Sequence, residues 1–179
     1  DVCSSDLKSY GNREVSIYLD KFYSYDELER LRTYILKNKN IKGLWINNLS
    51  EYYIFKDYGL ELNADLGLNI FNRNSLDFFK ELSFKSATLS PEMNSGQIQN
   101  IIKGEAMEVN VISYGRVPVM TMKHCPYSIE KNCVDERNCP TCKFKNYLLR
   151  DEKSVDFEVL RQNTFTEIFN SYPIRSEER

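Results

Sequence analysis

The feature that most constrains the fold of this chain is a regular alternation of short β-rich segments with helical ones. Apolar, β-rich stretches begin near residues 15, 43, 68, 86 and 109. Segments with apolar residues at helical spacing separate most of them, at about 25–37, 50–58, 75–82 and 95–102. Such alternation is typical of right-handed βαβ units around a parallel sheet. The sequence therefore predicts an α/β fold.

Two arrangements of a parallel sheet are compatible with this pattern. An open, doubly wound sheet usually carries a glycine-rich phosphate-binding turn after an early strand, and this chain has no such turn. A (β/α) barrel needs about 250 residues, so the strands expected here would form only its second half. We predict the second half of a TIM-type barrel over residues 8–122.

The first seven residues, Asp1 to Leu7, differ from the rest of the chain. They lack a start methionine and resemble the translation of a common sequencing adapter, so we expect them to be foreign to the gene. The alternative is a natural polar N-terminal strand. If the segment is foreign, Cys3 has no function and the chain is a fragment. We then expect the chain to pack against the missing N-terminal half of its own barrel.

Composition excludes several classes of protein. With 41% hydrophobic and 28% charged residues, the chain is neither disordered nor a coiled coil. Its 24 basic and 26 acidic residues provide no basic excess for nucleic acid, so any contact with RNA would be local. It contains neither an apolar run of the roughly 18 residues that span a bilayer nor a signal-peptide pattern. We therefore expect no membrane partner and a cytoplasmic location.

Four of the five cysteines lie close together, with seven, five and two residues between successive members. They are Cys125, Cys133, Cys139 and Cys142. Four thiolates at such spacing can bind a single zinc ion or an iron-sulfur cluster, whereas magnesium and calcium prefer oxygen ligands. The alternative is a set of free or disulfide-paired cysteines in a charged loop. We expect a cysteine-rich, metal-binding extension over residues 123–179.

Polar residues follow several of the expected strands. Barrel enzymes place their chemistry at the carboxyl ends of the strands. The residues at these ends are Asp20, Asn47, Asn48, Asn72, Ser90, Glu92 and His124, the last being the only histidine. Each of them is also explained as an ordinary turn residue. Together they indicate a polar pocket.

Several motifs resemble the collagenase-like peptidase family U32. Gly115-Arg116, a short apolar run to Met120, and then His124-Cys125-Pro126 are similar to that family's signature. Other elements agree in order over about residues 14–174, namely Asn63–Asn72, Thr88–Glu92, Leu149–Asp151 and Ile168–Ser171. The resemblance implies a (β/α) barrel and a peptidase, or collagenase-like protease.

Some relatives in this family act instead in the hydroxylation of RNA bases or quinone precursors and hold an iron-sulfur cluster on four cysteines. This chain departs from them in one respect. They often carry a late cysteine shortly before the Asn-Ser element, and residues 163–167 contain none. Cys139 and Cys142 would substitute for it.

Three hypotheses follow. The first is peptide hydrolysis, with Glu92 and His124 as the acid-base pair, Arg116 binding a carboxylate, and Asn69 and Asn72 binding substrate. The second is an iron-sulfur-dependent enzyme that hydroxylates bases in RNA. The third is a non-catalytic module in which zinc on the four cysteines ties the extension to the barrel.

Overall fold

The computed structural model describes residues 13–130, 132–133, 146–161 and 165–175. The chain divides after Val111 into two compact units, which are described separately below.

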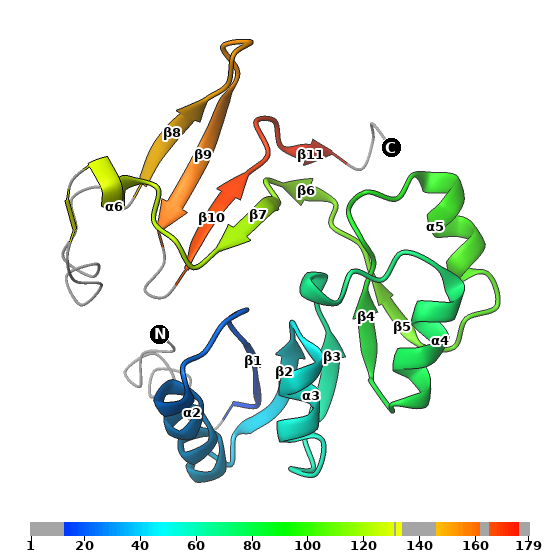
Figure 1. The fold of residues 1–179 in the computed structure, drawn as a ribbon. Helices are drawn as coiled ribbons and strands as arrows, with labels where there is room; N and C mark the ends of the chain where they lie inside the picture. The colour runs from blue at the N-terminus through cyan, green and yellow to red at the C-terminus, as the bar shows by residue number, and fades with distance from the viewer. Residues whose placement is uncertain (1–12, 131, 134–145, 162–164, 176–179) are drawn as a thin grey trace. The chain divides into compact units, whose positions relative to one another are not determined.

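The first unit contains a five-stranded parallel sheet. Its strands are β1 (Val15–Tyr18), β2 (Ile41–Ile46), β3 (Glu61–Ala64), β4 (Ser86–Thr88) and β5 (Glu108–Asn110), adjacent to one another in chain order (Figure 1). The connections contain α2 (Tyr25–Lys37), α3 (Leu49–Phe55), the short 3-10 helix η1 (Leu66–Leu68), α4 (Arg73–Glu81) and α5 (Ser95–Ile102). The expected α/β fold with a parallel sheet is confirmed.

The strand order determines where the helices lie. Each crossover moves one strand in the same direction, and right-handed crossovers in one direction place all helices on one face of the sheet. A doubly wound sheet would instead reverse its order. Figure 1 shows α2 to α5 along one side of the sheet. We call the opposite side the helix-free face, because none of the helices described in the first unit covers it.

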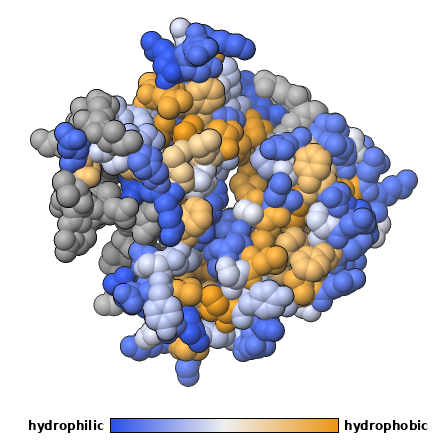
Figure 2. All heavy atoms as spheres, viewed as in Figure 1, coloured by the Kyte–Doolittle hydropathy of each residue, from blue (hydrophilic) through white to orange (hydrophobic). Residues whose placement is uncertain are grey.

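The hydrophobic core of the first unit lies between the sheet and its helices. Strand residues directed toward the helices are fully or nearly fully buried, and they include Ile17, Leu44, Ile46, Leu62 and Ala87. They pack with helix residues such as Phe55, Leu76 and Phe79. On the side seen in Figure 2, hydrophobic residues gather in the middle of this unit's surface, and hydrophilic ones surround them. The apolar residues of the alternating strand pattern are therefore those that face the helices and form the core.

Each of the four α-helices described in the first unit begins at a capping box. The N-cap residues are Ser24, Asn48, Asn72 and Asn94, and each accepts a hydrogen bond from the backbone N–H three residues later. The residue at that later position bonds back to the backbone of the cap. These reciprocal bonds satisfy amide groups that the first turn of a helix leaves unpaired.

One expected strand was placed wrongly. The third strand is Glu61–Ala64, not residues 68–72. In the latter segment Asn69 has φ of 46°, a left-handed conformation that ends η1 and interrupts an extended chain. Only an isolated bridge from Ile70 to Leu89 remains there. The actual strand has little β propensity, and its buried Asn63 is stabilised by hydrogen bonds.

The second unit is mainly antiparallel. Its larger sheet has the order β7-β10-β9-β8, from β7 (Pro118–Met122), β10 (Thr166–Phe169), β9 (Asp156–Arg161) and β8 (Asn146–Arg150). A smaller ladder joins β6 (Tyr114–Gly115) to β11 (Ile174–Arg175), and α6 (Tyr127–Glu130) follows β7. The segment 118–122, which the sequence assigns to the barrel part, therefore pairs inside this second sheet. In the described residues, no helix combines the length and apolar character needed to cross a bilayer.

Candidate functional site

One row of side chains crosses four strands on the helix-free face of the first unit. Tyr18 of β1 is in register with Trp45 of β2, Trp45 with Asn63 of β3, and Asn63 with Ser86 of β4. Residues in register on parallel strands point to the same face. The rings of Tyr18 and Trp45 stack with their centroids 4.8 Å apart and an interplanar angle of 9°. We call these two residues the aromatic pair.

The other half of the same face is polar. The Ser86 hydroxyl donates to Oδ1 of Asn63 at 2.8 Å and accepts from Nδ2 of Asn110 on β5 at 3.2 Å. Thr88 lies in register with Asn110 and so faces the same side. Asn63, Ser86 and Thr88 are all buried. These four residues, which we call the polar row, place amide and hydroxyl groups where the middle of a sheet usually has apolar side chains.

Asn47 forms hydrogen bonds with the connections that follow β1, β2 and β3 at the carboxyl ends of these strands. Its Nδ2 donates to the backbone oxygen of Leu19 at 2.7 Å, and its Oδ1 accepts from the backbone N–H of Gly67 at 3.2 Å. Its own backbone N–H donates to Oε2 of Glu51 at 2.7 Å. Asn47 is therefore a positioning residue that fixes the loops after β1, β2 and β3.

Glu51 is a buried carboxyl group at the same corner. It accepts hydrogen bonds from the backbone N–H groups of Asn47 and Asn48 and from Nδ2 of Asn48. Burial nevertheless dominates and raises the pKa of Glu51 to about 7, against the opposing effect of these bonds. Burial also raises the pKa of the neighbouring Tyr23. Part of the Glu51 population is thus protonated near neutral pH.

The two edges of the parallel sheet differ in charge. The four connections that leave the carboxyl ends of β1 to β4 contain Asp20, Asp65, Glu92 and Lys21. The four connections that return to the amino ends contain Lys39, Lys56, Lys85, Lys103, Asp57 and Glu105. Three acids and one base give a formal charge of −2 at the carboxyl edge, and four bases and two acids give +2 at the amino edge. The carboxyl edge is therefore the acidic one.

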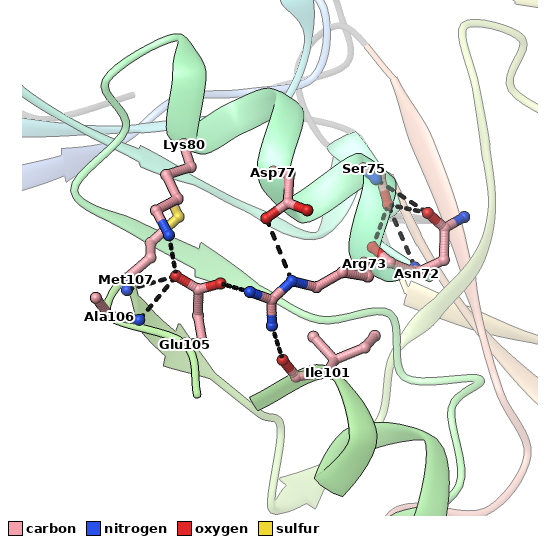
Figure 3. Close-up of polar contacts among 9 residues, drawn as sticks. All are labelled: Asn72, Arg73, Ser75, Asp77, Lys80, Ile101, Glu105, Ala106 and Met107. Carbon is pink, nitrogen blue, oxygen red and sulfur yellow. Dashed lines mark hydrogen bonds and ion pairs between the residues drawn. The ribbon is translucent and has the colours of Figure 1, made fainter. Parts of the chain in front are cut away.

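An ion-pair cluster around one buried carboxylate fixes α4 against the chain that leads into β5 (Figure 3). Glu105, whose side chain is only 1% exposed, lies 2.8 Å from both Arg73 Nη2 and Lys80 Nζ. Its Oε1 also accepts from the backbone N–H groups of Ala106 and Met107. These contacts, the Lys80 hydrogen bond first, lower the pKa of Glu105 to about 2. The cluster holds the start of β5 and with it the position of Asn110.

The predicted site residues of the first unit lie at the carboxyl edge. Glu92 is exposed in the connection after β4, and its backbone N–H lies 3.5 Å from the Ser90 hydroxyl. Asn72 caps α4, with its Oδ1 2.9 Å from the Ser75 N–H. Asn69 ends η1 in the left-handed conformation. The last two residues therefore have structural roles that account for their presence, whereas Glu92 has no side-chain partner in the described part of the chain.

The other predicted catalytic residues belong to the second unit. Arg116 is exposed, and its Nη1 lies 3.3 Å from Oε2 of Glu158 on β9. His124 is exposed in the turn after β7. Nearby, Nη1 of the buried Arg161 donates to the Lys123 carbonyl at 3.1 Å. Arg116 thus already pairs with one carboxylate, and a second would have to compete with it.

Two of the four predicted metal ligands can be located. Cys125 is half-buried and Cys133 is exposed, and both are free thiols. The Ser128 N–H donates to the Cys125 carbonyl, and the Cys133 N–H donates to the Ser128 carbonyl, both at 2.9 Å. The chain thus turns back on itself between these cysteines. Cys139 and Cys142 lie outside the described residues, and within the described ones no group of three metal ligands is found.

An aromatic contact fixes the start of this cysteine segment on the sheet. Tyr127 of α6 meets Tyr147 of β8 edge to face, with ring centroids 4.2 Å apart. The Tyr147 hydroxyl is buried and accepts or donates no hydrogen bond among the described residues. Burial first, and then the negative charge of Cys125, raise the pKa of Tyr147 to about 12. Two free thiols on a segment anchored in this way fit a thiolate metal site.

Sequence reasoning missed the polar row and the aromatic pair. The only signal for the polar row was Asn63 beside small residues in a short segment of low β propensity, which periodicity does not single out. The sequence pattern places Trp45 and Tyr18 in strands but does not predict that their rings stack. Pairing of these residues becomes visible once the strand register is known.

Comparison with known proteins gives one match. The family profile described as Peptidase family U32 matches residues 5–175, which include all the motifs quoted above. Neither the curated proteins nor the solved structures yield a match.

Proposed function

Since the chain belongs to peptidase family U32, as its motifs predict, we propose that it acts in the hydrolysis of peptide bonds. The family assignment is the observation on which this proposal rests. The enzyme binds its substrate on the helix-free face, at the carboxyl edge of the parallel sheet. It works in the cytoplasm, where reducing conditions keep its cysteine thiols available.

The fold supports a barrel as the framework. The strands follow one another in chain order, and the outer strands β1 and β5 each pair with a single neighbour among the described residues. Further parallel strands on both edges would close such a sheet into a (β/α) barrel. The helix-free face then lines the inside of the barrel.

The polar row supports peptide binding on this face. A peptide presents backbone N–H and C=O groups that need hydrogen-bond partners when they leave water. Thr88 and Asn110 offer a hydroxyl and an amide group at the position where a barrel binds its substrate, and Asn63 holds Ser86 beside them through its own hydrogen bonds. Hydrolysis also needs a proton acceptor for the attacking water and a proton donor for the leaving amine. Glu92, which is exposed at this edge, takes the acid-base role in the first unit. His124 and Arg116 are the predicted acid-base and carboxylate-binding residues of the second unit.

The cysteines of the second unit hold a metal centre. Cys125, Cys133, Cys139 and Cys142 are its ligands, and the first two are free thiols on an anchored turn. When bound, zinc would stabilise the second unit, whereas an iron-sulfur cluster would supply electron transfer. The alternative within this proposal is a zinc centre that stabilises the second unit and takes no part in catalysis.

A second function, the iron-sulfur-dependent modification of bases in RNA, is favoured by one observation. The stacked and partly exposed rings of Tyr18 and Trp45 resemble the aromatic platforms on which unpaired bases stack. The acidic carboxyl edge counts against it, because an RNA backbone is bound by positive charge. Peptide hydrolysis is therefore the preferred function.

The test is cleavage of fluorescein-labelled gelatin and of a quenched fluorescent peptide library by the full-length protein. We expect cleavage by the wild type and a loss of about 100-fold or more in kcat/KM for Glu92→Gln, the size typical of a lost acid-base group. The matched control is Glu81→Gln on the exposed end of α4, which should retain wild-type activity. An unchanged kcat/KM in Glu92→Gln would contradict the assigned role, and absence of cleavage by the wild type would contradict the function.

A further inference from the structure

The aromatic pair is unusual because it is both ordered by stacking and open to solvent. Tyr18 is 60% exposed although its ring lies flat against Trp45. One face of the Tyr18 ring is occupied by the stacking partner, and the other is open among the described residues, where β1 is an edge strand. An aromatic face that is open to solvent attracts cations through the quadrupole of the ring, and it does so most strongly for flat guanidinium groups.

A carboxylate lies on the same face and has no partner. Asp65 continues β3 in extended conformation, with φ of −100° and ψ of 178°, and its N–H donates to the Ile46 carbonyl at 2.9 Å. Alternation along the strand therefore directs its side chain to the side of Asn63 and Trp45. Among the described residues, the Asp65 carboxylate makes no hydrogen bond or ion pair. Burial first, and then the charge of Asp65, raise the pKa of Tyr18, so this carboxylate acts on the aromatic pair.

The surrounding charges favour a cationic ligand. The carboxyl edge has a formal charge of −2 from Asp20, Asp65, Glu92 and Lys21. A phosphate or a carboxylate would be repelled there. A neutral ligand would leave the half-buried Asp65 uncompensated, whereas a guanidinium group can stack on a ring and donate two parallel hydrogen bonds to a carboxylate.

We propose that Tyr18, Trp45 and Asp65 form a subsite for an arginine side chain of the peptide substrate. The guanidinium plane lies on the outer face of Tyr18, and Asp65 accepts its N–H groups. This inference rests on the proposed function and adds to it a preference for basic substrates. Arginine is preferred to lysine because an ammonium group has no flat face to stack and cannot make the bidentate pair.

Binding can be measured without turnover, because Trp45 is the only tryptophan of this chain. The probe is Nα-acetyl-arginine amide, titrated into the 179-residue chain while tryptophan fluorescence is recorded. Nα-acetyl-citrulline amide has the same shape without the charge, and Nα-acetyl-lysine amide has the charge without the planar group. We expect saturable binding in the order arginine, lysine, citrulline.

Two variants test the assigned contacts. Asp65→Asn and Tyr18→Leu should each weaken binding of the arginine probe by about two- to fivefold, as expected for an exposed ion pair or cation–π contact. The matched controls are Asp57→Asn, an exposed carboxylate at the amino edge, and Tyr114→Leu, an exposed tyrosine of the second unit. Both controls should bind as the wild type does.

Equal binding of the arginine and citrulline probes would overturn the proposal. So would an equal loss in Asp57→Asn and Asp65→Asn, or no saturable change in fluorescence. Because the titration involves no cleavage, a preference for arginine would stand even if the full-length protein failed to hydrolyse peptides. Conversely, cleavage without this preference would leave the proposed function intact and refute only the subsite.

Discussion

Glu51 and Glu105 are two buried carboxyl groups whose surroundings shift their pKa values in opposite directions. Glu51 receives only neutral hydrogen-bond donors, so the cost of burying its charge dominates. Glu105 contacts the cations of Lys80 and Arg73, which stabilise its ionised form. The same residue type therefore responds to different ranges of pH at the two positions.

Glu51 should make the protein less stable as the pH rises. Its pKa in the folded state, about 7, lies above its ordinary value of 4.5, so the folded state binds the proton more strongly. The free energy of unfolding should then fall between pH 4.5 and 7, by up to about 3 kcal/mol. Glu51→Gln stays neutral and should remove most of this decline between pH 5 and pH 8 in urea unfolding. The exposed control Glu81→Gln should retain it, and the same decline in both variants would refute the assignment.

Glu105 should have the opposite effect on stability, so that the free energy of unfolding falls as the pH decreases, and in a lower range of pH. Its pKa of about 2 in the folded state lies below the ordinary value, so its stabilising contribution is complete above pH 4.5 and is lost as the pH falls toward 2. Glu105→Gln should lower the urea midpoint at pH 7, and the difference from the wild type should shrink on acidification. Glu61→Gln removes only a half-exposed pair with Lys85 and should change the midpoint little. A larger loss in this control than in Glu105→Gln would contradict the cluster's role.

Among the elements of the fold, the short helix η1 is positioned by a close backbone approach. Gly67 lies so near Asn47 that a Cβ atom would overlap the Asn47 backbone oxygen. The Gly67 N–H also donates to the Asn47 side chain. Only glycine permits this approach, which links the loop after β3 to the end of β2.

Gly67→Ala should therefore destabilise the protein by about 1–3 kcal/mol, since a rigid backbone atom has to move. Gly96→Ala is the matched control, because Gly96 lies in α5 and an added Cβ there meets only the Asn94 side chain at 3.4 Å. That control should be neutral or more stable by up to about 1 kcal/mol. Thermal unfolding of both variants distinguishes the cases. Equal stability of the two would contradict the close approach.

The sequence predicts the helices of the first unit better than its third strand. Caps such as Ser24 and Asn48 are local signals, and each begins a helix by bonds within four residues. The strand at Glu61–Ala64 depends instead on neighbours distant in the chain, because Asn63 needs the Ser86 hydroxyl. Local patterns therefore located the helices, whereas the polar row required the register between strands.

At the scale of the whole molecule, the chain combines a parallel α/β unit with an antiparallel unit that bears the cysteines. The parallel sheet was predictable because its alternation extends over most of the first unit. The antiparallel pairing of β7 with β10 was not, because Met120 and Ile168 are partners 48 residues apart in the sequence. The proposed metal centre depends on four cysteines, of which only Cys125 and Cys133 lie in the described residues.

Metal content should depend on the cysteine cluster. We expect one zinc ion, or an iron-sulfur absorbance near ~400 nm with iron and sulfide, in the full-length protein purified without oxygen. Cys125→Ser and Cys133→Ser should each lose it, as should Cys139→Ser and Cys142→Ser. Ser113→Ala, at an exposed position outside the cluster, is the control and should retain the metal. Metal-free wild type, or full retention in the four variants, would contradict the proposed site.

The central claim is that a peptide substrate binds on the helix-free face of the parallel sheet at its carboxyl edge. The most direct test is amide hydrogen exchange of the full-length protein with and without a non-hydrolysable arginine-containing peptide. We predict slower exchange on binding around residues 63–67, 88–92 and 110, and no change in helices α2 and α4. Protection confined to those helices, or no protection at the carboxyl edge under saturating peptide, would contradict the claim.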